Sequence, residues 1–163
     1  MGKDKSSPRH VAVAIAYDVE QGAGSDGVII CLVSSRKHDG KLVLPKGGVE
    51  HGESSWQAAV REMWEEAGLR LAKDVEQHTQ PQEPLPDHKP HKSSPETDSA
   101  SPDFVPRAIY HAHQVRVRRA EQLADWPERE ERGERVWLPL AEARERIAWR
   151  KDIAACLARA SFP

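Results

Sequence analysis

Three glutamates, Glu62, Glu65 and Glu66, lie close together in the stretch PKGGVEHGESSWQAAVREMWEEAGL, residues 45–69. Residues four apart on an α-helix share one flank, so a helix would place Glu62 and Glu66 side by side, with Glu65 further round. Like charges at this spacing repel each other unless a positive group lies among them. Hard divalent cations such as Mg²⁺ prefer carboxylate oxygens and also bind phosphates. The spacing therefore predicts either a metal site or a helix face in which Arg61 neutralises the acids.

The residues around the glutamates carry the start and stop signals of a helix. Ser54 and Gln57 have the spacing of a capping box, and Gly68 stands where a C-terminal glycine is expected. We therefore predict a helix over about residues 55–67, preceded by a glycine-rich turn. Apolar residues recur along it at helical spacing and should dock it on a sheet; they are Trp56, Ala59, Val60, Met63 and Ala67.

Apolar runs on both sides of this helix predict the strands of that sheet. We expect strands over about residues 10–19, 28–35, 41–45, 104–118 and 136–140, and a C-terminal helix over about 152–160. The connection at 21–27 carries three glycines and is predicted to close a hairpin.

Two pairs of residues could suggest further metal or redox sites. His111 and His113 would lie on one face of their strand, but no third ligand follows at a suitable spacing. Hydrogen-bonded or solvated histidines are therefore favoured over a metal pair. Cys31 and Cys156 lie far apart without a CxxC spacing, so we predict two buried thiols rather than a zinc site or a disulfide.

The composition changes sharply after the predicted helix. Six of the 12 prolines lie between Pro81 and Pro102, among Ser, His, Asp and Lys, with few large apolar residues. Such a segment cannot build a packed core. We predict a single domain over residues 9–163 that carries a mobile, proline-rich insertion at about 77–103, after a flexible N-terminus of residues 1–8.

The overall composition limits the partners. The 163 residues carry a formal net charge of -2, which argues against charge-driven binding to nucleic acids or membranes. No apolar run approaches the roughly 20 residues that span a bilayer. Aromatic residues are 6% of the chain and do not cluster in the sequence, which argues against a platform for RNA bases. We expect no nucleic-acid and no membrane partner.

The stretch that holds the glutamates follows a longer pattern: Gly, five residues, Glu, seven residues, then Arg-Glu-apolar-any-Glu-Glu-any-Gly-apolar. Nine positions within 23 residues fit it, namely Gly47, Glu53, Arg61, Glu62, Met63, Glu65, Glu66, Gly68 and Leu69. This stretch resembles the Nudix box, the signature of hydrolases that act on nucleoside diphosphates linked to another group. The resemblance implies an α/β chain with the Nudix fold, an α/β/α sandwich with a mixed curved sheet and the Nudix loop-helix-loop.

The resemblance also implies roles for individual residues. Glu62 and Glu66 would bind Mg²⁺, with Mn²⁺ as an alternative, and Glu65 would be a further ligand or the general base. The backbone carbonyl of Lys46 or Gly47 would complete the coordination. Catalysis would also need Arg61, which would orient the acids by ion pairing, while Glu53 would bind a further metal or brace the loop.

Sequence outside the box narrows the resemblance. The run VSSRKHDGKLVLPKGGVEHGES and the WEEAG form look like the fungal diphosphoinositol polyphosphate phosphohydrolases, which also hydrolyse diadenosine polyphosphates such as Ap5A and Ap6A. The likeness covers residues 9–70 well and 104–157 more loosely. By position, the implied substrate-binding residues are Arg9, Ser35, Arg36, Lys37, Lys46, Gly47, Gly48, Arg107, and Lys151 or Arg150.

The implied function is Mg²⁺-dependent hydrolysis of phosphoanhydride bonds in a small-molecule polyphosphate. We expect a monomer in the cytoplasm, with the nucleus as a second compartment. Two alternatives stay open. One is a Nudix hydrolase for another substrate, such as Ap4A or capped RNA. The other is a catalytically inactive phosphate-binding module, against which the intact acids argue.

Overall fold

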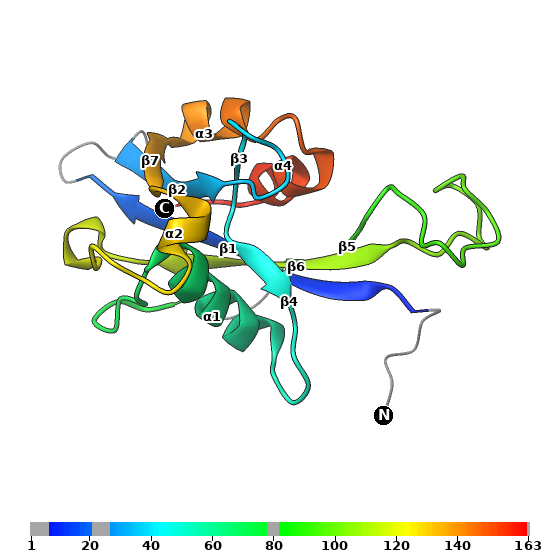
Figure 1. Ribbon diagram of the computed structural model, residues 1–163, viewed down its shortest axis with the longest axis horizontal. Helices are drawn as coiled ribbons and strands as arrows, with labels where there is room; N and C mark the ends of the chain where they lie inside the picture. The colour runs from blue at the N-terminus through cyan, green and yellow to red at the C-terminus, as the bar shows by residue number, and fades with distance from the viewer. Residues whose placement is uncertain (1–6, 21–26, 78–81, 163) are drawn as a thin grey trace.

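A mixed sheet with helices on both of its faces forms the body of the protein (Figure 1). The computed structural model describes residues 7–20, 27–77 and 82–162. Within them, none of the helices is long and apolar enough to cross a membrane. The elements are β1 (Arg9–Val19), β2 (Val28–Ser34), β3 (Leu42–Val43), β4 (Lys46–Gly48), α1 (Ser55–Ala67), β5 (Leu85–Pro86), β6 (Ala108–Arg116), the 3₁₀ turn η2 (Arg119–Glu121), α2 (Arg129–Arg132), β7 (Val136–Pro139), α3 (Leu140–Arg146) and α4 (Lys151–Ala158).

The sheet is built around β1. β1 pairs in parallel with β6 from Arg9 opposite Ala108 to Tyr17 opposite Arg116. Its other edge is antiparallel to β4 and then to β2. The strand order is β3-β2-β1-β6-β5, with β7 paired to β2. The predicted α/β class and mixed sheet are confirmed, while the predicted strand over 104–118 is shortened to β6.

Successive residues of β1 face opposite sides of the sheet, and both sides are buried. Val11, Val13 and Ile15 pack in the cluster that includes α3 and α4, whereas Ala12 and Ala14 pack in the cluster under α1. Small alanine side chains let a helix approach the sheet closely. Figure 1 shows α1 on one side of the sheet, and α3 and α4 on the other.

Helix α1 matches its prediction at both ends. Ser54 and Gln57 form both hydrogen bonds of a capping box, and Gly68 ends the helix with a left-handed φ of 65°. Gly68 is needed for a second reason, because a Cβ at this position would lie 2.8 Å from the ring of Trp126. The predicted apolar stripe is buried at Ala59, Met63 and Ala67 and partly buried at Trp56 and Val60.

The glycine-rich turn predicted before α1 is wrong at residues 46–48, which form strand β4 against β1. Two glycines rarely favour a strand, but here they keep the space between β1 and α1 free of side chains. The strand predicted over 41–45 is reduced to β3. Pro45 has no N–H to offer a sheet, and its carbonyl instead accepts a hydrogen bond from the Ala14 N–H at 2.9 Å.

The proline-rich segment is more structured than its composition suggested. The part that the structure describes, 82–103, contains β5, which pairs with β6, and it contains the buried Asp87. Residues 90–103 reach away from the body of the domain as an extension (Figure 1). The predicted flexible N-terminus and the hairpin loop at 21–27 lie largely outside the described residues.

The two histidines of β6 both have hydrogen-bonding partners. His113 is 2% exposed and shares a hydrogen bond of 2.8 Å with the Ser55 hydroxyl, with Trp56 edge-on to its ring. His111 shares a hydrogen bond of 2.9 Å with His10. Neither belongs to a group of three possible metal ligands among the described residues. Cys31 and Cys156 are free and buried, as predicted.

We expect His113 to make the protein sensitive to acid. Burial, and to a lesser degree the nearby His111, lowers the pKa of His113 from 6.5 to about 4. Between these pH values the unfolded chain binds a proton that the folded chain does not, so the free energy of unfolding falls as pH falls. The loss from pH 7 to pH 5 should be roughly 2 kcal/mol.

Urea unfolding of the wild type and of His113→Leu at both pH values tests this expectation. The variant should lose less stability on acidification, whereas His51→Leu, at an exposed position, should behave like the wild type. Equal pH dependence in the wild type and in His113→Leu would contradict the assignment.

Candidate active site

A pocket of about 760 Å³ lies where the first residues of β1 and β6 meet β4, α1 and α4. It brings together every substrate-binding residue expected from the sequence, although these residues are spread from one end of the chain to the other: Arg9, Ser35, Arg36, Lys37, Lys46, Gly47, Gly48, Arg107, Arg150 and Lys151. Glu62, Glu65 and Glu66 line the same pocket. The predicted residues thus share one cavity.

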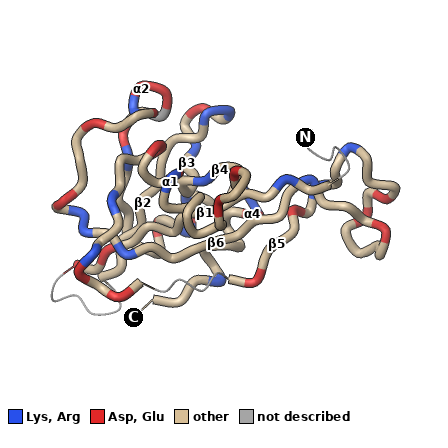
Figure 2. Tube along the Cα trace, turned by 90° about the horizontal axis from the view of Figure 1, so that it is seen from below, with Lys and Arg blue, Asp and Glu red and all other residues tan. Residues whose placement is uncertain are grey.

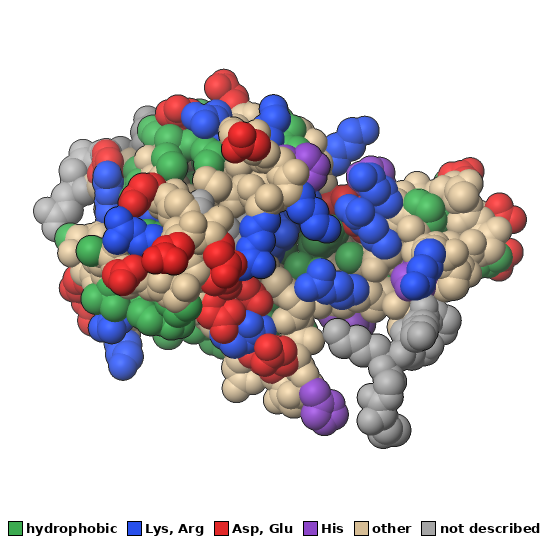
Figure 3. Space-filling model, in the orientation of Figure 1, with side chains coloured by type: hydrophobic (Ala, Val, Ile, Leu, Met, Phe, Trp, Pro, Cys, Tyr) green, Lys and Arg blue, Asp and Glu red, His purple; other side chains and the backbone are tan. Residues whose placement is uncertain are grey.

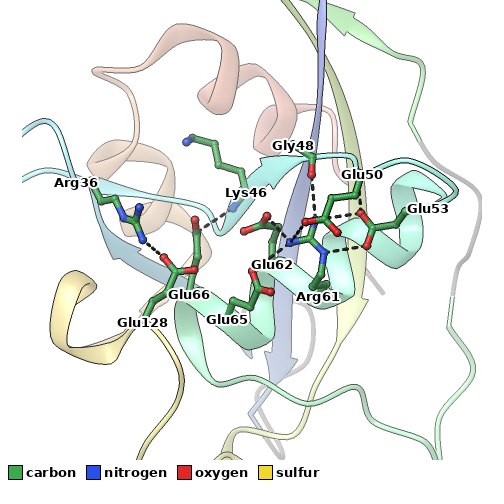
Figure 4. Close-up of polar contacts among 10 residues, drawn as sticks. All are labelled: Arg36, Lys46, Gly48, Glu50, Glu53, Arg61, Glu62, Glu65, Glu66 and Glu128. Carbon is green, nitrogen blue, oxygen red and sulfur yellow. Dashed lines mark hydrogen bonds and ion pairs between the residues drawn. The ribbon is translucent and has the colours of Figure 1, made fainter. Parts of the chain in front are cut away.

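Four carboxylates, those of Glu62, Glu65, Glu66 and Glu128, lie close together beside β4 (Figure 4). Glu62, Glu65 and Glu128 each present one oxygen so that the three oxygens lie within 4.8 Å of one another. Glu66 is 3% exposed, and one of its oxygens accepts a hydrogen bond of 3.1 Å from the Lys46 N–H. The backbone of β4 therefore orients one glutamate while the other three carboxylates converge.

Arg61 lies between the acids of α1 and Glu53 and does not line the pocket (Figure 4). Its guanidinium donates to both oxygens of Glu53 at 2.8 and 3.0 Å, to Glu62 at 2.8 Å and to Glu65 at 3.1 Å. A further bond of 3.0 Å reaches the Gly48 carbonyl. Arg61 is thus an orienting residue, and in this structure Glu53 braces Arg61.

Two observations show that the carboxylates suit a divalent cation. A Cβ at residue 47 would lie 2.0 Å from Glu62 Oε1, so only glycine leaves room for this carboxylate beside β4. Burial raises the pKa of Glu62 even though Arg61 donates to it, which means that its charge is poorly solvated. A hard cation would stabilise that charge, and the all-oxygen donor set is the one that Mg²⁺ and Mn²⁺ prefer.

The rest of the pocket is strongly basic. Eight Lys or Arg side chains line it, against five Asp or Glu side chains. In Figure 3 blue side chains gather beside the red ones across the hollowed face of the molecule. Figure 2, a Cα tube seen from below, shows Lys and Arg positions along the strands that lead toward the extension. Arg9 packs on Gly48, where a Cβ would lie 3.1 Å from its guanidinium.

Two of the predicted cations are already paired with acids. Arg36 forms ion pairs with Glu128 and Glu131, which lie just before and within α2. Arg107 donates to Asp87 at 2.5 Å. Both can still meet a phosphate, because a guanidinium has five N–H donors.

Several residues of the pocket were missed by the sequence analysis. Glu128 is placed by its backbone N–H, which donates to the Glu65 carbonyl at 2.9 Å, next to the buried Trp126. The charged connection that flanks Trp126 and Pro127 is the one sequence signal that could have suggested it. The other missed polar or aromatic lining residues are His38, His88, Lys89, Tyr110, Trp149 and Asp152.

Comparison with known proteins assigns this chain to a family. A family model described as the NUDIX domain matches residues 8–159. Over 138 residues the chain is 36% identical to Nudix hydrolase 16, mitochondrial, of Arabidopsis thaliana, covering 83% of this chain and 68% of that protein. Nudix hydrolase 21, chloroplastic, of the same plant is 31% identical over 84% of this chain and 59% of its own length. The matched part of the chain thus spans about two thirds or less of the length of these relatives.

Solved structures agree on the fold. A binary complex of a C. elegans Ap4A hydrolase superposes with a TM-score of 0.62 at 19% identity, over 92% of this chain and 93% of that one. A mutT/nudix family protein from Listeria innocua gives 0.54 at 23% identity, over 85% and 83%. At these identities the likeness concerns the fold alone.

Proposed function

The chain belongs to the Nudix family, and from this premise we propose that it hydrolyses phosphoanhydride bonds in small molecules dense in phosphate. Diphosphoinositol polyphosphates are the substrate class that we favour, with diadenosine polyphosphates such as Ap5A and Ap6A beside them. The observation that carries the proposal is the lining of one pocket by eight Lys or Arg side chains together with the carboxylates of α1. So many cations around one site suit a ligand with several phosphates.

The chemistry would be divided among residues that the structure brings together. Glu62, Glu66 and Glu128 would hold Mg²⁺, which when bound neutralises phosphate oxygens and acidifies a water molecule. Arg61 keeps Glu62 and Glu65 oriented, and the Lys46 N–H does the same for Glu66.

We assign the general base to Glu65. Its side chain is 34% exposed, against 10% for that of Glu62, so it can reach a water molecule in the pocket. The water oxygen forms a bond to phosphorus, the proton passes to Glu65, and the anhydride P–O bond breaks. The departing phosphate carries away the electron pair of that bond, and cations of the pocket stabilise its charge.

A second candidate, a preference for diadenosine polyphosphates, is favoured by the aromatic edge of the pocket. Trp149 lines it, with the ring of His38 at 4.9 Å from the Trp149 ring. The Trp149 N–H donates to the Leu42 carbonyl at 2.9 Å, which fixes the ring. A fixed indole can stack on a base. Trp149→Ala should therefore weaken Ap6A more than a diphosphoinositol substrate if adenine is bound there.

The proposed function is tested by comparing kcat/KM on diphosphoinositol pentakisphosphate, Ap6A, ADP-ribose and capped RNA. The double variant Arg36→Ala, Lys37→Ala should lower kcat/KM roughly 10- to 100-fold on the first two. This is about the effect of one charged hydrogen bond, 1.5–3 kcal/mol, because Arg36 already shares its donors with Glu128 and Glu131. ADP-ribose should lose less. Lys41→Ala, at an exposed position outside the pocket, is the matched control.

Two outcomes would overturn the proposal. One is a wild-type preference for ADP-ribose or capped RNA over both polyphosphates. The other is an equal loss on all substrates in the double variant, since that would mean that Arg36 and Lys37 do not discriminate by phosphate content.

A further inference from the structure

The base of the proline-rich extension forms a wall of the pocket. β5 pairs with β6, and the pairing continues outward: the Asp87 N–H donates to the Ala108 carbonyl at 2.9 Å and the Arg107 N–H to the Lys89 carbonyl at 3.0 Å. Pro90 and Pro106 form a further bridge. The two arms therefore run side by side as a ribbon, and Lys89 is fixed next to Arg107.

Asp87 is the anchor of this ribbon. It is 1% exposed, and its carboxylate accepts hydrogen bonds from the Arg107 guanidinium at 2.5 Å, the Tyr110 hydroxyl at 3.0 Å and the Lys89 N–H at 2.9 Å. Burial by itself would raise the pKa of Asp87, but the backbone and side-chain donors together outweigh it and lower the pKa to about 2, so Asp87 stays ionised. A buried carboxylate with three fixed donors holds Arg107 in one position.

The two residues that follow Asp87 face the pocket. His88 and Lys89 line it and are exposed, as are Arg107 and Lys151. His88 also shares a hydrogen bond of 3.0 Å with Asp152, in the first turn of α4. Since α4 and α1 pack on opposite faces of the sheet, this end of the pocket lies apart from the carboxylates of α1.

We propose that Lys89, His88 and Arg107 form a subsite for a phosphate group remote from the bond that is cleaved, with Asp87 as the positioning residue that fixes Arg107. The inference rests on the proposed hydrolysis of polyphosphates and deepens it. Two of the three subsite side chains, His88 and Lys89, come from the inserted segment. The insertion therefore selects substrates long enough, or with enough phosphates, to reach them.

Lys89→Ala tests the subsite without disturbing the core, because the side chain is exposed. KM for diphosphoinositol pentakisphosphate and Ap6A should rise about tenfold, with kcat within twofold and ADP-ribose unchanged. Loss of one charged hydrogen bond accounts for a change of this size. Lys92→Ala is the matched control, since Lys92 lies on the same segment, is exposed and does not line the pocket.

Asp87→Asn tests the positioning role. It keeps the size of the side chain but removes the charge that holds Arg107, so it should raise the same KM values and leave kcat on ADP-ribose unchanged. Asp98→Asn, at an exposed position of the segment, is its control. A merely structural role for Asp87 would instead lower kcat on every substrate in proportion to lost stability.

Binding of inositol hexakisphosphate, which has no anhydride bond, provides a readout independent of turnover. Calorimetry should show about tenfold weaker binding to Lys89→Ala than to Lys92→Ala or the wild type. If the wild type hydrolyses polyphosphates but Lys89→Ala and Lys92→Ala bind this probe equally, the subsite is wrong and the proposed function stands. If the wild type hydrolyses neither polyphosphate, the proposed function itself fails.

Discussion

Replacing Glu66 with glutamine is expected to lower Mg²⁺-dependent turnover by more than about 100-fold while the protein remains folded. Changing residues that only support a metal ligand typically costs 10- to 100-fold, and a ligand should cost more. Glu66 is 3% exposed beside β4, and the amide oxygen of glutamine can still accept the hydrogen bond from the Lys46 N–H. The packing of α1 is therefore preserved, while one negative charge is lost from the site.

Steady-state rates across a Mg²⁺ titration, together with thermal melts, provide the measurement. Glu145→Gln changes an exposed glutamate on α3 in the same way and should leave rate and melting temperature unchanged. Wild-type turnover in Glu66→Gln at saturating Mg²⁺ would remove Glu66 from the metal site.

Those parts of the structure that depend on neighbouring residues were predictable from the sequence. The bounds of α1 follow from Ser54, Gln57 and Gly68, whose capping bonds form within a few residues of one another. β1 follows from a continuous apolar run, because a strand buried on both faces needs apolar residues at every position. The Nudix fold is shown by the comparisons, and the motif on which it was predicted covers only 23 residues.

Those parts that depend on distant pairing were not predictable. Lys46–Gly48 becomes a strand only because β1 offers a free edge there. Asp87 is buried because Arg107 and Tyr110, some 20 residues away, satisfy its charge, so composition could not reveal it. Glu128 reaches the acids through a backbone bond to Glu65, for which no sequence spacing exists. Charged residues without periodicity can be placed only by their partners.

Arg36 illustrates how these long-range contacts change a predicted role. The sequence suggested a phosphate-binding cation, whereas the structure pairs Arg36 with Glu128 and Glu131. A phosphate must compete with these carboxylates for Arg36. Glu128 in turn lies close to Glu62 and Glu65. A substrate that draws Arg36 away would leave the Glu128 carboxylate available to bind a cation beside them.

Arg61→Ala should produce the largest loss of stability among single substitutions near the site, about 3 kcal/mol. Removing one partner of a buried ion pair leaves the other charge without compensation. Here Arg61, whose side chain is 23% exposed, compensates Glu53 and Glu62, whose side chains are only 15% and 10% exposed. Arg61→Lys should be intermediate, because an ammonium keeps the charge but cannot donate to Glu53, Glu62 and Gly48 in a planar fork. Urea unfolding at pH 7 measures both, with Arg144→Ala on the exposed face of α3 as the control.

The same variant separates a metal site from a salt-bridged helix face. Without Arg61, the carboxylates of Glu62, Glu65 and Glu128 repel one another with no positive side chain among them. A cation that binds between these carboxylates should therefore bind the folded variant more tightly than the folded wild type. A ligand that binds only the folded protein stabilises it in proportion to the logarithm of its concentration over its Kd. Saturating Mg²⁺ should therefore raise the unfolding free energy of Arg61→Ala more than that of the wild type. If Mg²⁺ stabilises neither protein, the acids of α1 are a helix face neutralised by Arg61 and no metal site.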